Sequence, residues 1–276
     1  MPSLSEISYS REECISAVRK YYNFLVGMYL DEAEVVEPPP GGWPSITTAT
    51  MAPLGKTDEV ISLLRHLPYI REKKDDMYNV QTAAWCYFTN WEADASLISR
   101  DSSCVESVKI STESASLYEI LPPHVVSITR SPRDWTTLLI DTELGIGLWY
   151  ECPGEVRDWP LREKVLDDPY DYEEDEEQAE WRGECGAWSI PDFFEVLKDQ
   201  FRELKFVPKS PRAVVDVYIS EGVAFPDMIE MLQGIYREHG WPDMEKYRKK
   251  DCLKAVQKAL KERYPRLADS EWVEEE

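Results

Sequence analysis

Two apolar runs around a short turn constrain the fold of this chain more than any other feature. Residues 136–140 and 146–150 are rich in apolar, β-branched and aromatic side chains, and they flank Asp141-Thr142-Glu143-Leu144-Gly145. A turn of this length that ends in glycine favours a hairpin, because glycine takes the positive φ that reverses the chain. The nearly continuous apolar character of residues 138–140 predicts a strand that is covered on both faces.

Three further segments are predicted to form strands. Residues 81–91, 105–110 and 125–129 turn to β-branched and aromatic side chains in short runs. Such runs are typical of strands, because these side chains pack well on a pleated surface. Together with the hairpin they predict a mostly antiparallel sheet.

Helical signals surround the predicted strands. Ser10 and Glu13 have the spacing of a capping box, and apolar residues follow at helical period, so residues 10–30 are predicted to form the first helix. Thr57 is placed to cap a second, short helix whose apolar face ends at Pro68.

The clearest single helix is predicted after Ser189. Ile190-Pro191 places a proline early in this helix, where its missing N–H costs nothing. Its apolar stripe consists of Phe193, Phe194, Leu197, Phe201 and Leu204. Beyond Pro211, residues 228–239 and 246–264 again show helical periodicity.

These segments predict an α+β fold with a central, mostly antiparallel twisted sheet, helices packed on it, and helical additions at both ends. Residues 1–210 are predicted to form one α+β domain. Residues 211–276 are predicted to form a C-terminal helical extension that packs on this core.

The charge of the chain disfavours direct binding to nucleic acid. The formal net charge is −22, and the isoelectric point lies near 4.6. A negative field repels phosphate backbones, and the same field attracts basic proteins and speeds their encounter at low salt. Solubility alone is the other interpretation of this charge.

One segment concentrates the acidic residues. Nine of the fourteen residues from 167 to 180 are acidic and none is basic, so repulsion predicts an extended or mobile loop. Its mixture of aromatic and acidic side chains suits a basic groove on a partner, whereas a purely solvated loop is the alternative. The basic residues between Lys246 and Lys254 are interpreted as a solvated helix face or an intramolecular partner for acidic groups.

The predicted contact surface combines this acidic loop with the hairpin turn at residues 141–145. Its candidate partner-binding residues are Asp141, Glu143, Tyr170, Tyr172, Glu173, Glu174, Asp175, Glu176 and Glu177. The expected partner is a protein, basic in character, while its identity and the oligomeric state stay open.

No catalytic, metal or cofactor signature is found in the sequence. The three histidines lie in different segments without metal-ligand spacing, and the six cysteines lack paired CxxC spacing. Gly145-Ile146-Gly147 lacks the third glycine of a dinucleotide fingerprint. We therefore predict no metal and no cofactor. An enzyme that uses a carboxylate pair or a Cys–His pair is one alternative, and a structural subunit of a larger assembly is another.

The apolar runs are too short for membrane insertion. None approaches the roughly 20 residues that cross a bilayer, and no signal-peptide pattern opens the chain. Scattered, reduced cysteines fit the cytoplasm or the nucleus, where disulfides seldom persist. We expect a protein of one of these compartments that does not bind membranes.

The middle of the chain resembles the SUKH superfamily, which includes a fungal cell-wall assembly regulator and bacterial toxin-immunity proteins. The resemblance spans roughly residues 125–205 and depends on two stretches, WTTLLIDTELG at 135–145 and AWSIPDFFEVL at 187–197, with an acidic loop between them. Residues 67–69 correspond to the early Leu-Pro-aromatic segment of the family, but the Asn-Gly pair that usually follows is missing.

The resemblance implies a central twisted sheet and a role in protein–protein interaction without catalysis. Bacterial members bind and block toxins, many of them nucleases, and the fungal member acts as a signalling hub. The expected function is therefore a non-catalytic interaction module with an acidic surface, in a regulatory or immunity role.

Overall fold

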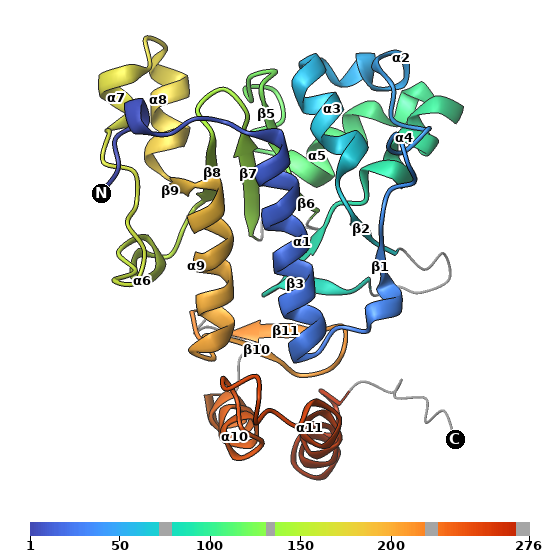
Figure 1. Ribbon diagram of the computed structural model, residues 1–276, viewed down its shortest axis with the longest axis vertical. Coiled ribbons are helices and arrows are strands. Elements are labelled where there is room, and N and C mark those ends of the chain that lie inside the picture. The colour runs from blue at the N-terminus through green and yellow to red at the C-terminus, as the bar shows by residue number, and fades with distance from the viewer. Residues whose placement is uncertain (72–78, 131–135, 219–225, 269–276) are drawn as a thin grey trace.

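Two long helices lie side by side in front of the main sheet (Figure 1). They are α1 (Arg11–Met28) and α9 (Ile190–Arg202), which begin at the predicted caps Ser10 and Ser189. The ring centroids of Tyr21 and Phe194 lie 5.6 Å apart across their interface. The computed structural model describes residues 1–71, 79–130, 136–218 and 226–268, and these residues have the predicted α+β fold.

The main sheet is antiparallel and has the strand order β5-β7-β8-β9. Its strands are β5 (Val125–Ser127), β7 (Thr137–Asp141), β8 (Ile146–Tyr150) and β9 (Gly186–Ser189). The predicted hairpin is confirmed, because Asp141 pairs with Ile146 and Gly145 has a φ of 72°.

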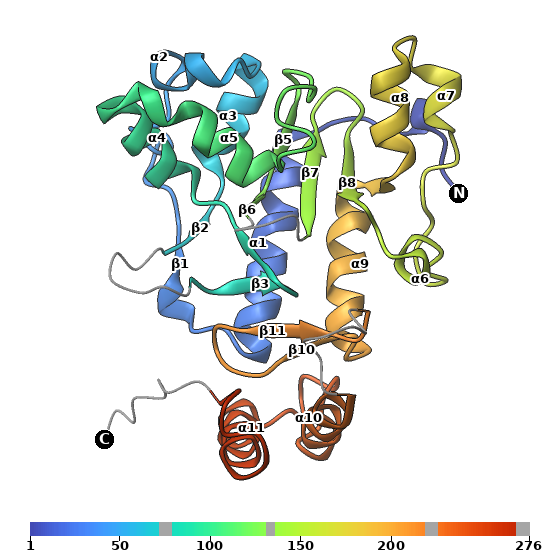
Figure 2. The ribbon, with the colours of Figure 1, turned by 180° about the vertical axis from the view of Figure 1, so that it is seen from behind.

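Strand β7 is buried on both faces, as its apolar run predicts. Leu138 and Ile140 belong to the large core that contains the side chains of α1 and α9. Leu139 belongs to a second, smaller core with Trp181 and Cys185. Figure 2 shows β7 and β8 from behind, with the two long helices on their far side. Helix α8 (Glu176–Gly183) and the residues after it therefore contribute to the core on this face of the sheet.

Three small sheets complete the strands of the described residues. One has the order β3-β4-β6 and contains β3 (Gln81–Ala83), β4 (Cys86–Phe88) and β6 (Thr129–Arg130). The two others pair β1 (Val35–Val36) with β2 (Tyr69–Ile70), and β10 (Phe206–Pro208) with β11 (Val214–Asp216). The β10–β11 pair was not predicted from the sequence.

The remaining helices surround the sheets. Thr57 caps α3 (Asp58–His66) as predicted, since its hydroxyl accepts from Val60 N. The others are α2 (Thr48–Met51), α4 (Trp91–Arg100), α5 (Val105–Glu113), α6 (Gly154–Arg157), α7 (Pro169–Tyr172), α8 (Glu176–Gly183), α10 (Pro226–Glu238) and α11 (Lys249–Arg263). No helix of the described chain is long and apolar enough to span a membrane.

One strand prediction is wrong, and a second is wrong in part. Residues 105–110 lie in helix α5, because Val105, Val108 and Thr112 recur at helical spacing and turn toward the protein interior. Residues 81–91 form the two short strands β3 and β4, after which Asn90 accepts from Ala93 N and thereby caps α4.

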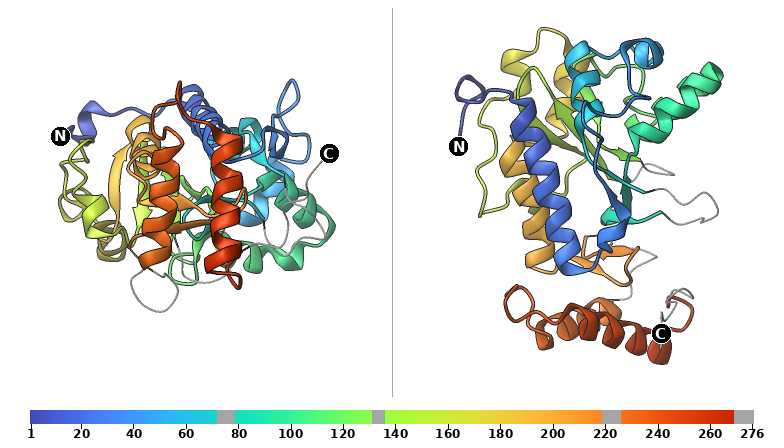
Figure 3. Two further views of the ribbon diagram at one scale, coloured as in Figure 1. Left: turned by 90° about the horizontal axis from the view of Figure 1, so that it is seen from below. Right: turned by 45° about the vertical axis from the view of Figure 1, so that its right-hand side comes forward.

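The C-terminal helices lie below the body of the molecule and contact the end of α1 (Figure 3). Tyr247 donates from its hydroxyl to Met28 O at 2.8 Å, and Lys249 Nζ donates to Val26 O and Leu30 O at 2.6 and 2.7 Å. These bonds satisfy carbonyls that a helix end leaves without partners. The predicted domain boundary at residue 210 falls inside the β10–β11 hairpin.

Candidate partner-binding surface

The acidic segment forms two short helices, so the expectation of a loop over residues 167–180 is wrong. Asp168 accepts a hydrogen bond from Tyr170 N at the start of α7, and Asp175 accepts one from Glu177 N at the start of α8. Carboxylates at a helix N-terminus bind free amide groups and interact favourably with the helix dipole. The acidic residues therefore promote helix formation here, despite their mutual repulsion.

The inner side of α8 is held against the main sheet. Trp181 and Cys185 are buried in the smaller core behind β7. Gln178 Nε2 donates to Ile120 O at 2.8 Å, and its Oε1 accepts from Trp181 Nε1 at 2.9 Å. This apolar and hydrogen-bonded inner face fixes the orientation of the helix.

A buried arginine joins the acidic segment to the hairpin. Arg182 Nη2 lies 2.9 Å from Asp141 Oδ2, and Arg182 Nε lies 2.8 Å from Glu173 Oε1. The side chains of Arg182 and Asp141 are 1% and 0% exposed. The guanidinium also stacks over Trp181, 4.6 Å from the ring centroid. Separating the acidic segment from the hairpin would leave a buried charge without its counter-ion, which is energetically costly. The ion pairs of Arg182 therefore hold these two segments together.

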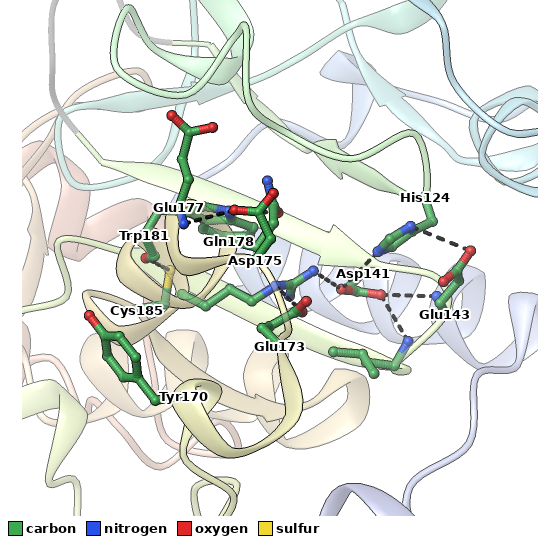
Figure 4. Close-up of polar contacts among 12 residues, drawn as sticks. His124, Asp141, Glu143, Tyr170, Glu173, Asp175, Glu177, Gln178, Trp181 and Cys185 are labelled. Atoms are coloured by element: carbon green, nitrogen blue, oxygen red, sulfur yellow. Dashed lines mark hydrogen bonds and ion pairs between the residues drawn. The ribbon is translucent and has the colours of Figure 1, made fainter.

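Asp141 also organises the turn that follows it. Its Oδ1 accepts from Glu143 N at 3.0 Å and from Leu144 N at 2.8 Å. The ring of His124 lies between the carboxylates of the turn, with Nε2 3.6 Å from Asp141 Oδ2 and Nδ1 3.4 Å from Glu143 Oε1. Figure 4 shows Asp141, Glu173 and His124 gathered in this cluster, with Glu177 and Tyr170 pointing away from it.

The outer side of the segment carries a dense set of carboxylates. We name this set the acidic face, and it consists of the exposed residues Glu174, Asp175, Glu176, Glu177 and Glu180. Glu176, Glu177 and Glu180 belong to α8, whose opposite side is held against the sheet, and Glu174 and Asp175 directly precede this helix. The charge is therefore displayed at a fixed position.

Apolar side chains are exposed in the same region of the chain. Leu161, Leu166 and Tyr170 are 58%, 61% and 60% exposed. Leu166 is tied to the N-terminal segment, because its N–H donates to Pro2 O at 3.0 Å. Single exposed apolar residues are ordinary, but these lie within ten residues of one another and directly before the acidic face.

The structure separates the predicted contact residues into three groups. Glu143, Tyr170, Glu174, Asp175, Glu176 and Glu177 are at the surface. Tyr172 and Glu173 are partly buried, and burial raises the pKa of Tyr172 to about 12, so its phenol stays neutral. Asp141 is fully buried and lies behind the surface, where it cannot touch a partner.

Arg182 is not among the residues that were predicted from the sequence. It is the only basic residue between Lys164 and Lys198, a stretch that includes the whole acidic segment. A lone basic residue among so many carboxylates is a signal for a buried counter-ion. Its pairing with Asp141 was not predictable from sequence spacing, because Asp141 lies on strand β7, far from Arg182 in the chain.

An enzyme that uses a carboxylate pair would bring both groups together in a pocket. A surface cavity of about 290 Å³ lies at the N-terminal ends of α1 and α9, with Glu13 and Asp192 in its lining. Burial raises the pKa of the carboxyl groups Asp94 and Glu113, but neither lines this cavity. In the described ranges no group of three or more His, Cys, Asp or Glu residues is arranged to hold a metal ion.

Comparisons with protein families, curated proteins and solved structures found no match to this chain. The resemblance to the SUKH superfamily therefore stays a prediction.

Proposed function

We propose that this protein is an interaction module that binds a basic protein partner through the acidic face, in the regulatory or immunity role that the SUKH resemblance implies. One observation carries the proposal. Exposed apolar side chains and exposed carboxylates follow one another along residues 166–180, next to Arg182, which pairs with both Glu173 of this segment and Asp141 of the sheet.

This combination suits specific binding better than charge alone. Exposed carboxylates attract and orient a basic surface, but each exposed ion pair contributes only about 0–1 kcal/mol. Apolar contact adds roughly 25 cal/mol per Å² of buried surface, which Leu166 and Tyr170 are placed to supply. The anchored segment loses little conformational freedom on binding, so less of this energy is offset by ordering.

The test is affinity capture from native extract, followed by reconstitution with the purified captured protein. The variant Glu174→Lys/Glu176→Lys/Glu177→Lys reverses charges of the acidic face and leaves the capping Asp175 in place. We expect a stoichiometric basic partner whose affinity, measured by calorimetry, falls at least about tenfold in this variant and also falls as salt rises.

A matched control separates position from net charge. Glu203→Lys/Glu230→Lys/Glu238→Lys changes the net charge equally at exposed sites elsewhere, so it is expected to retain most of the affinity. A second variant, Leu166→Ser/Tyr170→Ser, is expected to weaken binding with little change in its salt dependence. Equal affinities for the wild type and both surface variants would refute the proposed surface.

A further inference from the structure

A stripe of lysines runs along the outer side of α11. Lys250, Lys254, Lys258 and Lys261 follow at spacings of four, four and three residues, which places them on one helix face. All four are exposed, while Cys252, Val256 and Leu260 bury the opposite face. We name these four residues the lysine stripe.

The lysine stripe stands out against the charge of the whole protein. The chain has a net charge of −22, yet residues 246–268 contain nine basic and only two acidic residues. Within the described residues, none of the four lysines has a carboxylate within ion-pair distance. This helix face therefore presents its positive charge to the surroundings.

The acidic face cannot neutralise the lysine stripe of its own chain. Helices α7 and α8 lie at one end of the molecule, and α11 lies at the other end (Figures 1 and 3). The sequence interpretation of the basic stretch as an intramolecular partner therefore does not hold for the acidic face. Among the residues that the structure describes, neither surface covers the other.

We infer that the lysine stripe binds the acidic face of a second copy of this chain. The inference rests on the proposed function, because it uses the same acidic face and names one partner for it. The two surfaces complement each other in charge: the lysine stripe lies along α11, and the acidic face lies at the N-terminal end of α8 and directly before it. Their contact is heterologous, so it leaves one acidic face and one lysine stripe open at the ends of each assembly.

Salt has two opposite effects on such an association. Two copies with a charge of −22 each repel one another at long range, and salt screens this repulsion over a Debye length of about 8–10 Å. Close ion pairs across the contact weaken only at higher salt. Association is therefore expected to be strongest at intermediate salt and weaker at both extremes, unlike the binding of a strongly basic partner.

The test uses the purified full chain and two neutralising variants in sedimentation velocity. Glu174→Gln/Glu176→Gln/Glu177→Gln removes charge from the acidic face, and Lys250→Gln/Lys254→Gln/Lys258→Gln removes it from the lysine stripe. Glutamine keeps the helix propensity of the residues that it replaces. We expect concentration-dependent assemblies of the wild type, and at least about tenfold weaker self-association of each variant alone.

Mixing the two variants tests directly whether the lysine stripe of one chain binds the acidic face of another. The first retains only the lysine stripe, and the second retains only the acidic face, so together they can form one contact. We expect a 1:1 dimer that does not grow further, because both of its open ends are neutralised. Circular dichroism of each variant checks that the helices are intact.

Three outcomes would overturn the inference: a wild-type chain that stays monomeric at every concentration and salt, variants that assemble like the wild type, or a mixture without the dimer. Binding of a DNA or heparin probe that depends on the lysine stripe, with a monomeric wild type, would assign the stripe to a polyanion instead. None of these results decides the proposed function, which is tested separately with the captured basic protein.

Discussion

At the scale of single residues, buried ion pairs join elements that are distant in the chain. Lys56 Nζ lies 2.6 Å from Glu113 Oε1 and donates to Val125 O at 2.9 Å, and both side chains are almost completely buried. Burial lowers the pKa of Lys56 and raises the pKa of Glu113, and their mutual attraction opposes both shifts. Each charge is therefore tolerated only because the other is present.

The change Lys56→Met tests this dependence. It leaves Glu113 buried without a cation and should lower the free energy of unfolding by about 3–5 kcal/mol near neutral pH. The stability loss should shrink as the pH falls. The folded-state pKa of the Glu113 carboxyl is raised, so at low pH the group is protonated and no unpaired charge is buried; this contribution to stability is lost as the pH rises through that pKa. Urea unfolding from about pH 8 down to about pH 5.5 measures both effects.

The double variant Lys56→Met/Glu113→Leu is the control, since it removes both charges together. Its stability should lie near that of the wild type or above it. A Lys56→Met variant whose stability loss is the same across this pH range would contradict the buried-charge explanation.

At the scale of elements, the β7–β8 hairpin depends on one glycine. Gly145 has a φ of 72°, and a Cβ placed there would lie 2.7 Å from Tyr9 N and 2.8 Å from Ser8 C. Both atoms belong to the backbone of the segment that enters α1. The turn therefore requires glycine for its conformation and for its close approach to the N-terminal segment.

Gly145→Ala is expected to lower the free energy of unfolding by about 1–3 kcal/mol, toward the upper end of this range. Gly55→Ala is a matched control, because Gly55 has a φ of 71° but no heavy atom within 4 Å of the added Cβ. The difference between their urea midpoints isolates the steric contact. Equal losses in the two variants would show that the N-terminal segment adapts without cost.

At the scale of the whole molecule, the C-terminal helices are coupled to the body through a buried tryptophan. Trp241 is 3% exposed, and its Nε1 donates to Phe201 O at 2.9 Å. Its ring contacts Phe24 of α1 edge to face, with centroids 5.7 Å apart. These contacts connect the segment between α10 and α11 to both long helices.

Trp241→Ala should destabilise the protein by about 3–5 kcal/mol, because it leaves a large cavity and removes the hydrogen bond to Phe201 O. Hydrogen exchange should then accelerate in α10, in α11 and at the C-terminal end of α1 together. The exposed neighbour Met244 serves as the control, and Met244→Ala should change stability by no more than about 0.5 kcal/mol. Faster exchange confined to α11 would indicate that the C-terminal helices open independently of the body.

Elements with local signals were predictable from the residues of their own segment. Ser10, Thr57 and Ser189 cap the helices that they precede, and Gly145 closes the predicted hairpin. Each of these signals acts between residues only a few positions apart, so the rest of the fold is not needed to interpret it. The α+β class follows from the order of these elements.

The tertiary structure alone decided which residues are buried and which charges meet. Residues 105–110 have the composition of a strand, yet their position against the sheet edge lets Val105 and Val108 pack as a helix face. Asp141 was predicted at the surface, but Arg182 of a distant helix buries it. The placement of the acidic face and the lysine stripe at opposite ends likewise depends on how the chain folds, because charge composition carries no information about distance in space.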